Sequence, residues 1–374
     1  MADIIITAAP YCYGPTSKAL CLAGELQTRH RVTYIGGEPG LSLAKAASLD
    51  SVIALADRDH WSDVALDALT RSAVVISSLD SRAIRIAASY GVPSVFFDTL
   101  LWLRTEMPAF SELAQSYVAQ TFFRAPARAI THDCDSIAMV GPVFSRSLDT
   151  LLATKKHPGG RILVNFGGLT SPAMLQLADV RYIIWIASVL QRTTIASDQM
   201  IVCLPIHLHD LKEMVKSYLP SANITTPSMD EFHDLLCNSL VVVTIPGLES
   251  VLEAIYLRKP LVFLPPHNGT QLIQLREYTR AGIGDCVPLP EAVRDLDDSC
   301  RDLHKLTKSV QLGNQEGATD NGLGVRLASY VRDSVCSLHR ASRVESVVAR
   351  NAQFLETLGV GGRLAAVDLV EYFC

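Results

Sequence analysis

The sequence lacks the features that would place it in a membrane or on a nucleic acid. Its 374 residues contain no run close to the roughly 18–20 uninterrupted apolar residues that a membrane-spanning helix needs. The nearest approach is Val180–Leu190, which is too short and includes Arg181. The formal net charge is −5 and no long basic block occurs, so the sequence argues against nucleic acid as a partner.

Several common site signatures are also missing. The chain has no G-x-G-x-x-G, Walker or G-x-S-x-G motif, and its nine cysteines include no C-x-x-C pair. The first residues, MADIIITAAP, lack the basic start of a secretory leader, so we expect reduced thiols and a cytoplasmic location. His207 and His209 have no third ligand at a recognised spacing, and we therefore expect no metal.

Short apolar runs that alternate with helical patterns fill both halves of the chain. This alternation is typical of an α/β protein whose parallel sheet is covered on both faces. Periodicity is lost over residues 145–160, which predicts a boundary between two domains. The pattern also predicts a helix over Phe110–Ala119, a strand over Thr121–Arg124 and a Gly/Asn/Asp loop over Leu312–Gly324.

The stretch from Leu240 to Gln271 has the pattern of strand, turn, helix, strand and loop. Pro246-Gly247 ends a short apolar run, and Leu248, Leu252 and Ile255 then recur at helical spacing. Such a unit places backbone N–H groups of a helix start beside a strand end, where phosphate binds well. The polar residues placed to contact a ligand are Glu249, Ser250, Glu253, Asn268, Thr270 and Gln271.

Two other glycine-containing turns precede predicted helices. One includes Gly14, and the other includes Gly167 and Gly168 before a helix start at Ser171-Pro172. Two such helix starts in one domain can converge on a single pyrophosphate, and Gly14 could serve donor or acceptor. A plain connection that needs glycine is the alternative in both cases.

The spacing Pro227…Gly247-x-x-Ser250-x-x-Glu253…Thr270-Gln271 resembles the donor signature of GT-B glycosyltransferases that use nucleotide diphosphate sugars. The resemblance implies two Rossmann-like doubly wound domains that face across a cleft, with C-terminal helices crossing back. Residues 1–150 would then bind the acceptor, 158–345 would bind the nucleotide sugar, and 346–374 would pack on the first domain.

The resemblance also implies roles for individual residues. The turn with Gly247, Leu248, Glu249 and Ser250 would hold the pyrophosphate, and Glu253 would take the ribose hydroxyls. Pro227 and Met229 would flank the uracil, while Asn268, Thr270 and Gln271 would lie beside the sugar. Many members have histidine at the position of Ile245 and aspartate at that of Thr270, so the donor contacts differ there. A solvated helix carboxylate is the alternative for Glu253.

A sugar transfer needs a base that deprotonates the acceptor. The first strand–helix loop lacks the histidine that many GT-B enzymes place there, so Asp80 and Asp98, at predicted strand ends, are the catalytic candidates. Each could instead cap a helix. The acceptor-binding candidates are Tyr11, Tyr13, Phe97, Trp102 and Arg104, with core packing an equally good interpretation of Trp102.

The segments YCYGPTSKAL and FFDTLLWLR are also similar to cytosylglucuronate synthases of nucleoside-antibiotic pathways. That resemblance implies transfer of glucuronic acid from UDP-glucuronate to cytosine or hydroxymethylcytosine, with Arg104 or Arg276 contacting the donor carboxylate. It implies a UDP-sugar co-substrate without other cofactors. A lipid-linked or other natural-product acceptor, a nucleotide-sugar hydrolase or epimerase, and a non-catalytic partner are the alternatives, and a homodimer is left open.

Overall fold

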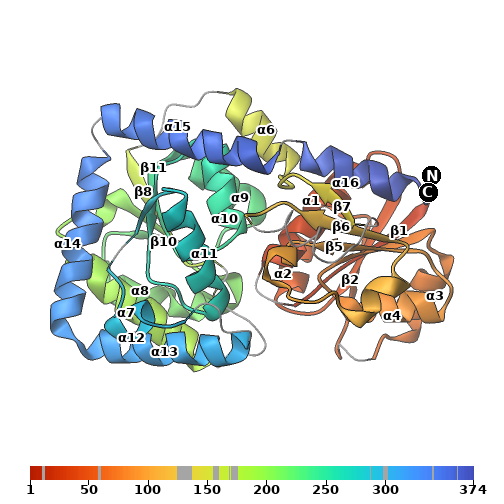
Figure 1. Ribbon diagram of the computed structural model, residues 1–374, viewed down its shortest axis with the longest axis horizontal. Helices are drawn as coiled ribbons and strands as arrows, with labels where there is room; N and C mark the ends of the chain where they lie inside the picture. Colours follow the sequence, from red (N-terminus) through yellow and green to blue (C-terminus); the bar gives the residue numbers. More distant parts are fainter. Residues whose placement is uncertain are drawn as a thin grey trace. The chain divides into compact units, whose positions relative to one another are not determined.

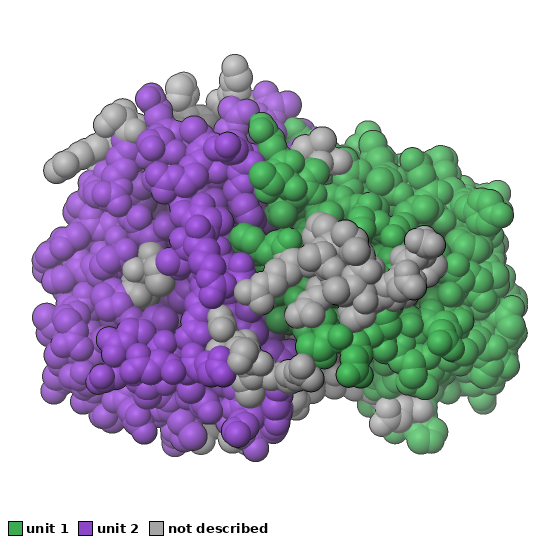
Figure 2. Space-filling view, in the orientation of Figure 1, with its two compact units in different colours: residues 1–149, 356–374 green, residues 150–355 purple. Residues whose placement is uncertain are grey.

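The computed structural model describes residues 1–374 except 11–12, 58–59, 124–136, 155–159, 168, 170–175, 287, 298–301, 339–340 and 360. The chain divides into two compact units (Figure 2). Unit 1 contains Met1–Asp149 and Glu356–Cys374, and unit 2 contains Thr150–Leu355. The predicted helix start at Ser171-Pro172 lies outside the described residues.

Unit 1 is built on a seven-stranded sheet in the order β3-β2-β1-β4-β5-β6-β7, and its strand pairs are parallel. The strands are β1 (Asp3–Ala8), β2 (Arg31–Gly36), β3 (Ser51–Ala54), β4 (Val74–Ser78), β5 (Ser94–Asp98), β6 (Ser116–Gln120) and β7 (Ile137–Val140). Its helices are α1 (Gly14–Leu26), α2 (Gly40–Ala46), α3 (Asp63–Arg71), α4 (Ser81–Ser89), η1 (Leu101–Leu103), η2 (Ala109–Leu113) and α16 (Gly362–Glu371), with α6 (Arg146–Ala153) at the unit's edge.

Helices cover both faces of this sheet (Figure 1). Ile5, Ile35 and Val75 pack against α3 and α4, because alternate side chains of a strand point to one face. The other face meets α1, and α16 packs beside α1 and against β6 and β7. The last segment of the chain is therefore part of the first unit's core.

One prediction for unit 1 was wrong. Residues 110–119 do not form a helix, because only the short η2 forms and β6 follows at Ser116. The side chains of Tyr117, Val118 and Ala119 are all buried, and β6 pairs with both β5 and β7. A strand buried on both faces has no alternating pattern, which explains why its position was predicted too late, at Thr121.

Unit 2 has a six-stranded sheet in the order β10-β9-β8-β11-β12-β13, again with parallel pairs. The strands are β8 (Arg161–Asn165), β9 (Met200–Cys203), β10 (Asn223–Thr225), β11 (Ser239–Thr244), β12 (Leu261–Phe263) and β13 (Asp285–Cys286). The helices are α7 (Gln176–Gln191), η3 (Ser197–Gln199), η4 (Ile206–Leu211), α8 (Lys212–Tyr218), α9 (Met229–Asn238), α10 (Glu249–Tyr256), α11 (Gly269–Arg280), α12 (Glu291–Arg294), α13 (Leu303–Thr319), α14 (Asn321–Ser337) and α15 (Ala341–Leu358).

The loop predicted over Leu312–Gly324 is also absent, because α13 continues to Thr319 and α14 begins at Asn321. The glycines of this stretch serve helix packing. A Cβ on Gly313 would lie 2.7 Å from Val293, and one on Gly317 would lie 2.9 Å from Pro290. Close approach of α13 to α12 therefore outweighs the low helix propensity of glycine. None of the described helices is long and apolar enough to span a membrane.

Arg363 anchors α16 to the rest of unit 1. Its guanidinium donates to the Phe144 carbonyl at 2.8 Å and to Asp149 at 2.7 Å, and it lies 3.1 Å from Glu25. The Arg363 side chain is 13% exposed and Glu25 is 16% exposed, so their contact is largely shielded from water, whereas Asp149 is 43% exposed. Gly362 completes the contact, because a Cβ there would lie 1.9 Å from the Gly141 carbonyl oxygen.

We predict that Arg363→Met loosens α16 by about 1–3 kcal/mol, the scale of losing a partner of buried polar groups. Hydrogen exchange over Gly362–Glu371 should then accelerate roughly 10- to 100-fold. Arg343→Met is the control, because its pair with Asp285 is half exposed and contributes little. Unchanged exchange in the Arg363 variant would show that α16 is held by its apolar face alone.

Candidate functional site

Unit 2 has a topological switch point between β8 and β11, where the strand order reverses. Ligands of doubly wound folds bind outside the carboxyl ends of the strands at such a point. Here Asn165 ends β8 and Thr244 ends β11, and both side chains are buried. Asn165 Nδ2 donates to Thr244 Oγ1 at 3.2 Å, and Asn165 Oδ1 accepts from the Gly167 N–H at 2.9 Å. One asparagine thus joins the two turns that follow these strands.

The turn after β11 leaves space above its glycine. The nearest atom to a Cβ built on Gly247 is Ser250 Oγ, at 3.7 Å, so a ligand can approach this backbone. From below, the buried Tyr278 hydroxyl donates to the Gly247 carbonyl at 3.1 Å. The following helix α10 (Glu249–Tyr256) has no side-chain cap hydrogen bond at Leu248. The start of such a helix, with its backbone N–H groups and its dipole, favours an anion at the switch point.

Glu253 lies one turn along α10 and is only 4% exposed. Its Oε1 is 3.4 Å from Nε2 of His233, a fully buried residue of α9. The interpretation as a solvated carboxylate is therefore wrong. His233 was not among the predicted site residues, although its position four residues after Met229 places it on the helix that begins beside Pro227. Pro227 and Met229 are half-buried, and contact between them and a base remains a prediction.

The loop before α11 is held by its own amides. Asn268 Oδ1 caps the helix by accepting from the Gln271 N–H at 2.9 Å, and Gln271 Oε1 accepts from the His267 N–H at 2.8 Å. Both side chains are less than a tenth exposed, whereas Thr270 is half-buried. The two amides thus shape the loop, and their predicted sugar contacts stay untested.

His267 lies behind this loop, with Nε2 3.3 Å from Asp179 Oδ1. Burial lowers the pKa of His267 to about 4, which outweighs a backbone hydrogen bond to Ala178 that acts in the opposite direction. The imidazole is therefore neutral at pH 7. It supports the loop as a neutral group and carries no charge for a diphosphate.

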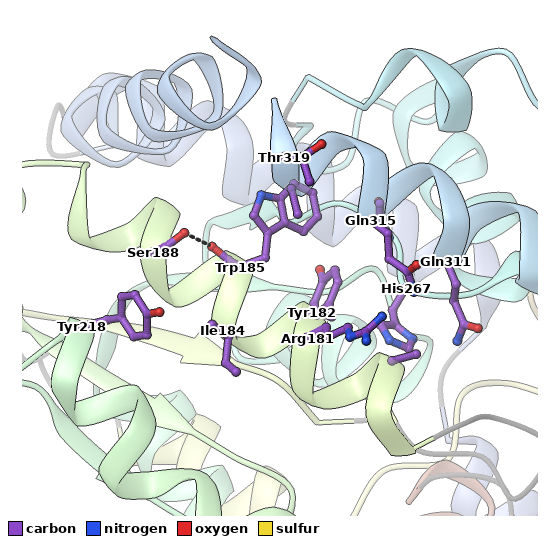
Figure 3. A pocket seen from close by; sticks show the side chains of 13 residues that line it. Arg181, Tyr182, Ile184, Trp185, Ser188, Tyr218, His267, Gln311, Gln315 and Thr319 are labelled. Carbon is purple, nitrogen blue, oxygen red and sulfur yellow. Dashed lines mark hydrogen bonds between the residues drawn. The ribbon is translucent and has the colours of Figure 1, made fainter. Parts of the chain in front are cut away.

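A cavity of about 530 Å³ opens on the α7 and α13 side of unit 2 (Figure 3). Tyr182 and Trp185 of α7 line it together with Gln311, Asn314 and Gln315 of α13. None of the predicted donor-binding residues lines this cavity. One lining residue, His267, directly precedes the predicted residue Asn268 in the sequence. The cavity is therefore distinct from the β8/β11 switch point.

Unit 1 has its own switch point between β1 and β4. Leu79, just after β4, has φ of 63°, which is unusual for a branched side chain and often marks functional sites. The next residue, Asp80, caps α4 through Oδ1, which accepts from the Arg82 N–H at 3.2 Å, as the capping alternative predicted. On the β1 side, Tyr13 precedes α1 and Gly14 opens it. Tyr11 and Gly168 lie outside the described residues.

Asp98 ends β5 and is fully buried. It accepts from the Leu100 N–H at 2.7 Å, from Arg104 Nε at 2.5 Å and from the Tyr117 hydroxyl. Burial raises the pKa of Tyr117, and the neighbouring Asp98 charge raises it further. Burial would lower the pKa of Arg104, but the charges and hydrogen bonds of Asp98 and Tyr117 together outweigh burial and raise it. The three side chains thus form an ion pair with a neutral phenol.

The aromatic acceptor candidates in this region are packed inside unit 1. Phe97 is 1% exposed and Trp102 is 3% exposed, and the Trp102 indole donates to the Thr99 carbonyl at 3.1 Å. The core interpretation therefore describes both side chains here, and acceptor contact remains a prediction. Across the described part of the chain, no three His, Cys, Asp or Glu side chains are grouped to hold a metal ion.

Comparison with solved structures identifies the fold. The chain is similar to Os79 of O. sativa in complex with UDP, with a TM-score of 0.60, 13% identity and coverage of 99% of this chain and 100% of that one. The glycotransferase of kitacinnamycin and the calicheamicin glycosyltransferase CalG4 give TM-scores of 0.55 and 0.54 at 15% and 16% identity, each covering 100% of this chain and 98% of theirs. No family model matches the sequence, and the curated proteins give no match. The chain has the GT-B fold, as predicted.

Os79 is in complex with UDP, and if the β8/β11 switch point of this chain binds UDP, we predict that Asn165→Ala weakens that binding about tenfold, because it frees both turns there. Calorimetric titration with UDP measures this affinity. Asn223→Ala is the matched control, since that asparagine is exposed at the start of β10, on the opposite side of the sheet from the carboxyl ends of the strands. Full affinity in a folded Asn165 variant would mean that the asparagine does not shape the binding site.

Proposed function

We propose that this protein is a glycosyltransferase that moves a sugar from a UDP-sugar, bound by unit 2, to a small acceptor bound by unit 1. The observation that carries the proposal is the β8/β11 switch point. There an uncapped helix start, an open glycine turn and the Asn165 link come together at one strand edge. The GT-B fold, which Os79 bound to UDP also has, supports the choice of donor.

The donor would be held by backbone groups more than by cations. The diphosphate would accept hydrogen bonds from N–H groups in the first turn of α10, where the dipole of the helix favours negative charge. Glu253 would accept from the ribose hydroxyls, with His233 fixing the orientation of its carboxylate. Glu253 would thus accept hydrogen bonds as a buried carboxylate, which agrees with its exposure of 4%.

In the reaction, an acceptor oxygen or nitrogen attacks the anomeric carbon as the bond from that carbon to UDP breaks. A base removes the acceptor proton, and the N–H groups at the start of α10 stabilise the departing diphosphate. We favour Asp80 as the base. Its Oδ2 has no hydrogen-bond partner among the described residues, whereas both oxygens of Asp98 are occupied.

The narrower proposal is transfer of glucuronic acid from UDP-glucuronate to cytosine or hydroxymethylcytosine. Of the two arginines considered for the donor carboxylate, Arg276 donates to the Arg294 and Leu296 carbonyls at 2.9 and 2.6 Å. Because these backbone hydrogen bonds occupy Arg276, they disfavour a contact between Arg276 and the carboxylate of UDP-glucuronate. Arg104 is paired with Asp98 in unit 1, which supports a contact with the acceptor.

Product analysis by mass spectrometry tests the proposed function. The protein would be incubated with UDP-glucose, UDP-N-acetylglucosamine or UDP-glucuronate, with and without cytosine and other small acceptors. We expect UDP and a glycosylated acceptor to form together. Release of free sugar without any acceptor would instead identify a hydrolase. Binding of UDP with no turnover of any donor would identify a non-catalytic partner.

We predict that Glu253→Ala weakens UDP binding by about 1–3 kcal/mol, the scale of lost charge-assisted hydrogen bonds. His233→Ala should cause a smaller loss in the same direction, because it removes only the orienting group. Calorimetry gives both values, with Glu316→Ala on the exposed side of α13 as control. Unchanged affinity in a folded Glu253 variant would exclude the ribose assignment.

We predict that Asp80→Asn lowers kcat at least 100-fold while UDP affinity stays within about twofold, because the amide cannot accept the acceptor proton. Asp98→Asn is the comparison, and steady-state kinetics with a fixed acceptor measures both. A larger loss of kcat in Asp98→Asn than in Asp80→Asn, with both proteins folded, would reverse the assignment of the base.

A further inference from the structure

The buried carboxylate of Asp98 calls for an explanation. Removing a carboxylate from water costs several kcal/mol, and apolar side chains of similar volume often replace a buried ion pair without loss of stability. Asp98 is nevertheless fully buried, with contacts to Leu100, Arg104 and Tyr117 that occupy both oxygens. Such an arrangement holds Arg104 in one orientation, and an oriented guanidinium is useful where it meets a ligand.

Arg104 is only partly committed by this contact. Asp98 takes its Nε, and the guanidinium carbon lies 5.9 Å from the Phe96 ring centroid. Among the described residues, no other carboxylate or carbonyl oxygen accepts a hydrogen bond from the guanidinium. The side chain is 25% exposed, and a guanidinium has N–H donors on its two terminal nitrogens besides the Nε–H that Asp98 accepts.

The position of Arg104 relates it to the proposed base. Its anchor ends β5, and β5 pairs with β4 through Ser78 and Phe97. The Leu79 N–H donates to the Phe97 carbonyl at 3.1 Å, so Asp80 follows a residue bonded directly to β5. Neighbouring strands lie about 4.8 Å apart. Asp98, which holds Arg104, and Asp80 therefore lie at the carboxyl ends of adjacent strands, on the same edge of the sheet of unit 1.

We propose that Arg104, held by Asp98 and Tyr117, determines acceptor specificity by binding a planar edge with two hydrogen-bond acceptors. A guanidinium fork matches a carboxylate, and it equally matches the N–C=O edge of a pyrimidinone base. A carboxylate and a pyrimidinone base thus both offer two hydrogen-bond acceptors side by side in one plane. The inference rests on the proposed function, since it names the acceptor class of the same site.

Ligand-observed NMR titrations without donor test the proposal. Benzoate and cytosine are the probes that carry the edge, and benzyl alcohol is a probe of similar size that lacks it. The proteins are the wild type, Arg104→Lys, which keeps the charge but loses the fork, and Tyr117→Phe, which removes one donor to Asp98. Arg85→Lys is the control, because Arg85 also lies over an aromatic ring, that of Phe110, at 6.0 Å. UDP affinity is measured on every sample.

We expect the wild type to bind benzoate or cytosine more tightly than benzyl alcohol, and the bound probe identifies the source of the edge. Arg104→Lys should weaken that probe about tenfold or more, and Tyr117→Phe less, while Arg85→Lys and UDP affinity stay unchanged. With a turned-over acceptor, Arg104→Lys should raise the acceptor KM more than it lowers kcat.

Three results would overturn the assignment of Arg104. They are equal binding of benzyl alcohol and the edge-bearing probes, an equal loss in Arg85→Lys, and no binding of either edge-bearing probe to wild-type protein that binds UDP. Failure of the wild-type protein to bind UDP is a different outcome. It would contradict the proposed donor site whatever the acceptor probes show.

Discussion

The proposed donor site depends above all on the hydrogen bond from Asn165 to Thr244. This bond joins the ends of the two strands between which the sheet reverses its order, and the same asparagine holds the Gly167 turn. A parallel sheet directs its strand ends and helix starts to one edge, but it does not fix the turns there. Asn165 does so with both ends of its amide, and Tyr278 supports the Gly247 turn from below.

The two units use charge differently at their strand ends. In unit 2 the diphosphate would meet backbone N–H groups, while the buried His267 behind the neighbouring loop is neutral, so the charge of the ligand would be balanced by dipoles. In unit 1 the buried Asp98 fixes Arg104, and the proposed base Asp80 follows the neighbouring strand β4. This division suits a transferase, in which one substrate leaves as an anion and the other must lose a proton.

The sequence predicted the doubly wound plan because alternating apolar runs and helical periods are local signals. It failed where a residue acts through distant contacts. The glycines at 313 and 317 indicated a loop, but they permit close packing of α13 on Val293 and Pro290. The β6 strand was misplaced because both of its faces are buried. The contacts that give Asn165 and His233 their proposed roles join residues 79 and 20 positions apart, which sequence patterns do not show.

Hydrogen exchange measured with and without UDP tests the central claim most directly, because unit 2 offers two separate regions for a ligand. The account predicts slower exchange in UDP at the start of α10 (Glu249–Tyr256) and in α9 (Met229–Asn238), with no change along α13 (Leu303–Thr319). Protection confined to α13 and the adjoining α7 would place the nucleotide in the 530 Å³ cavity and would contradict the assignment of the switch point.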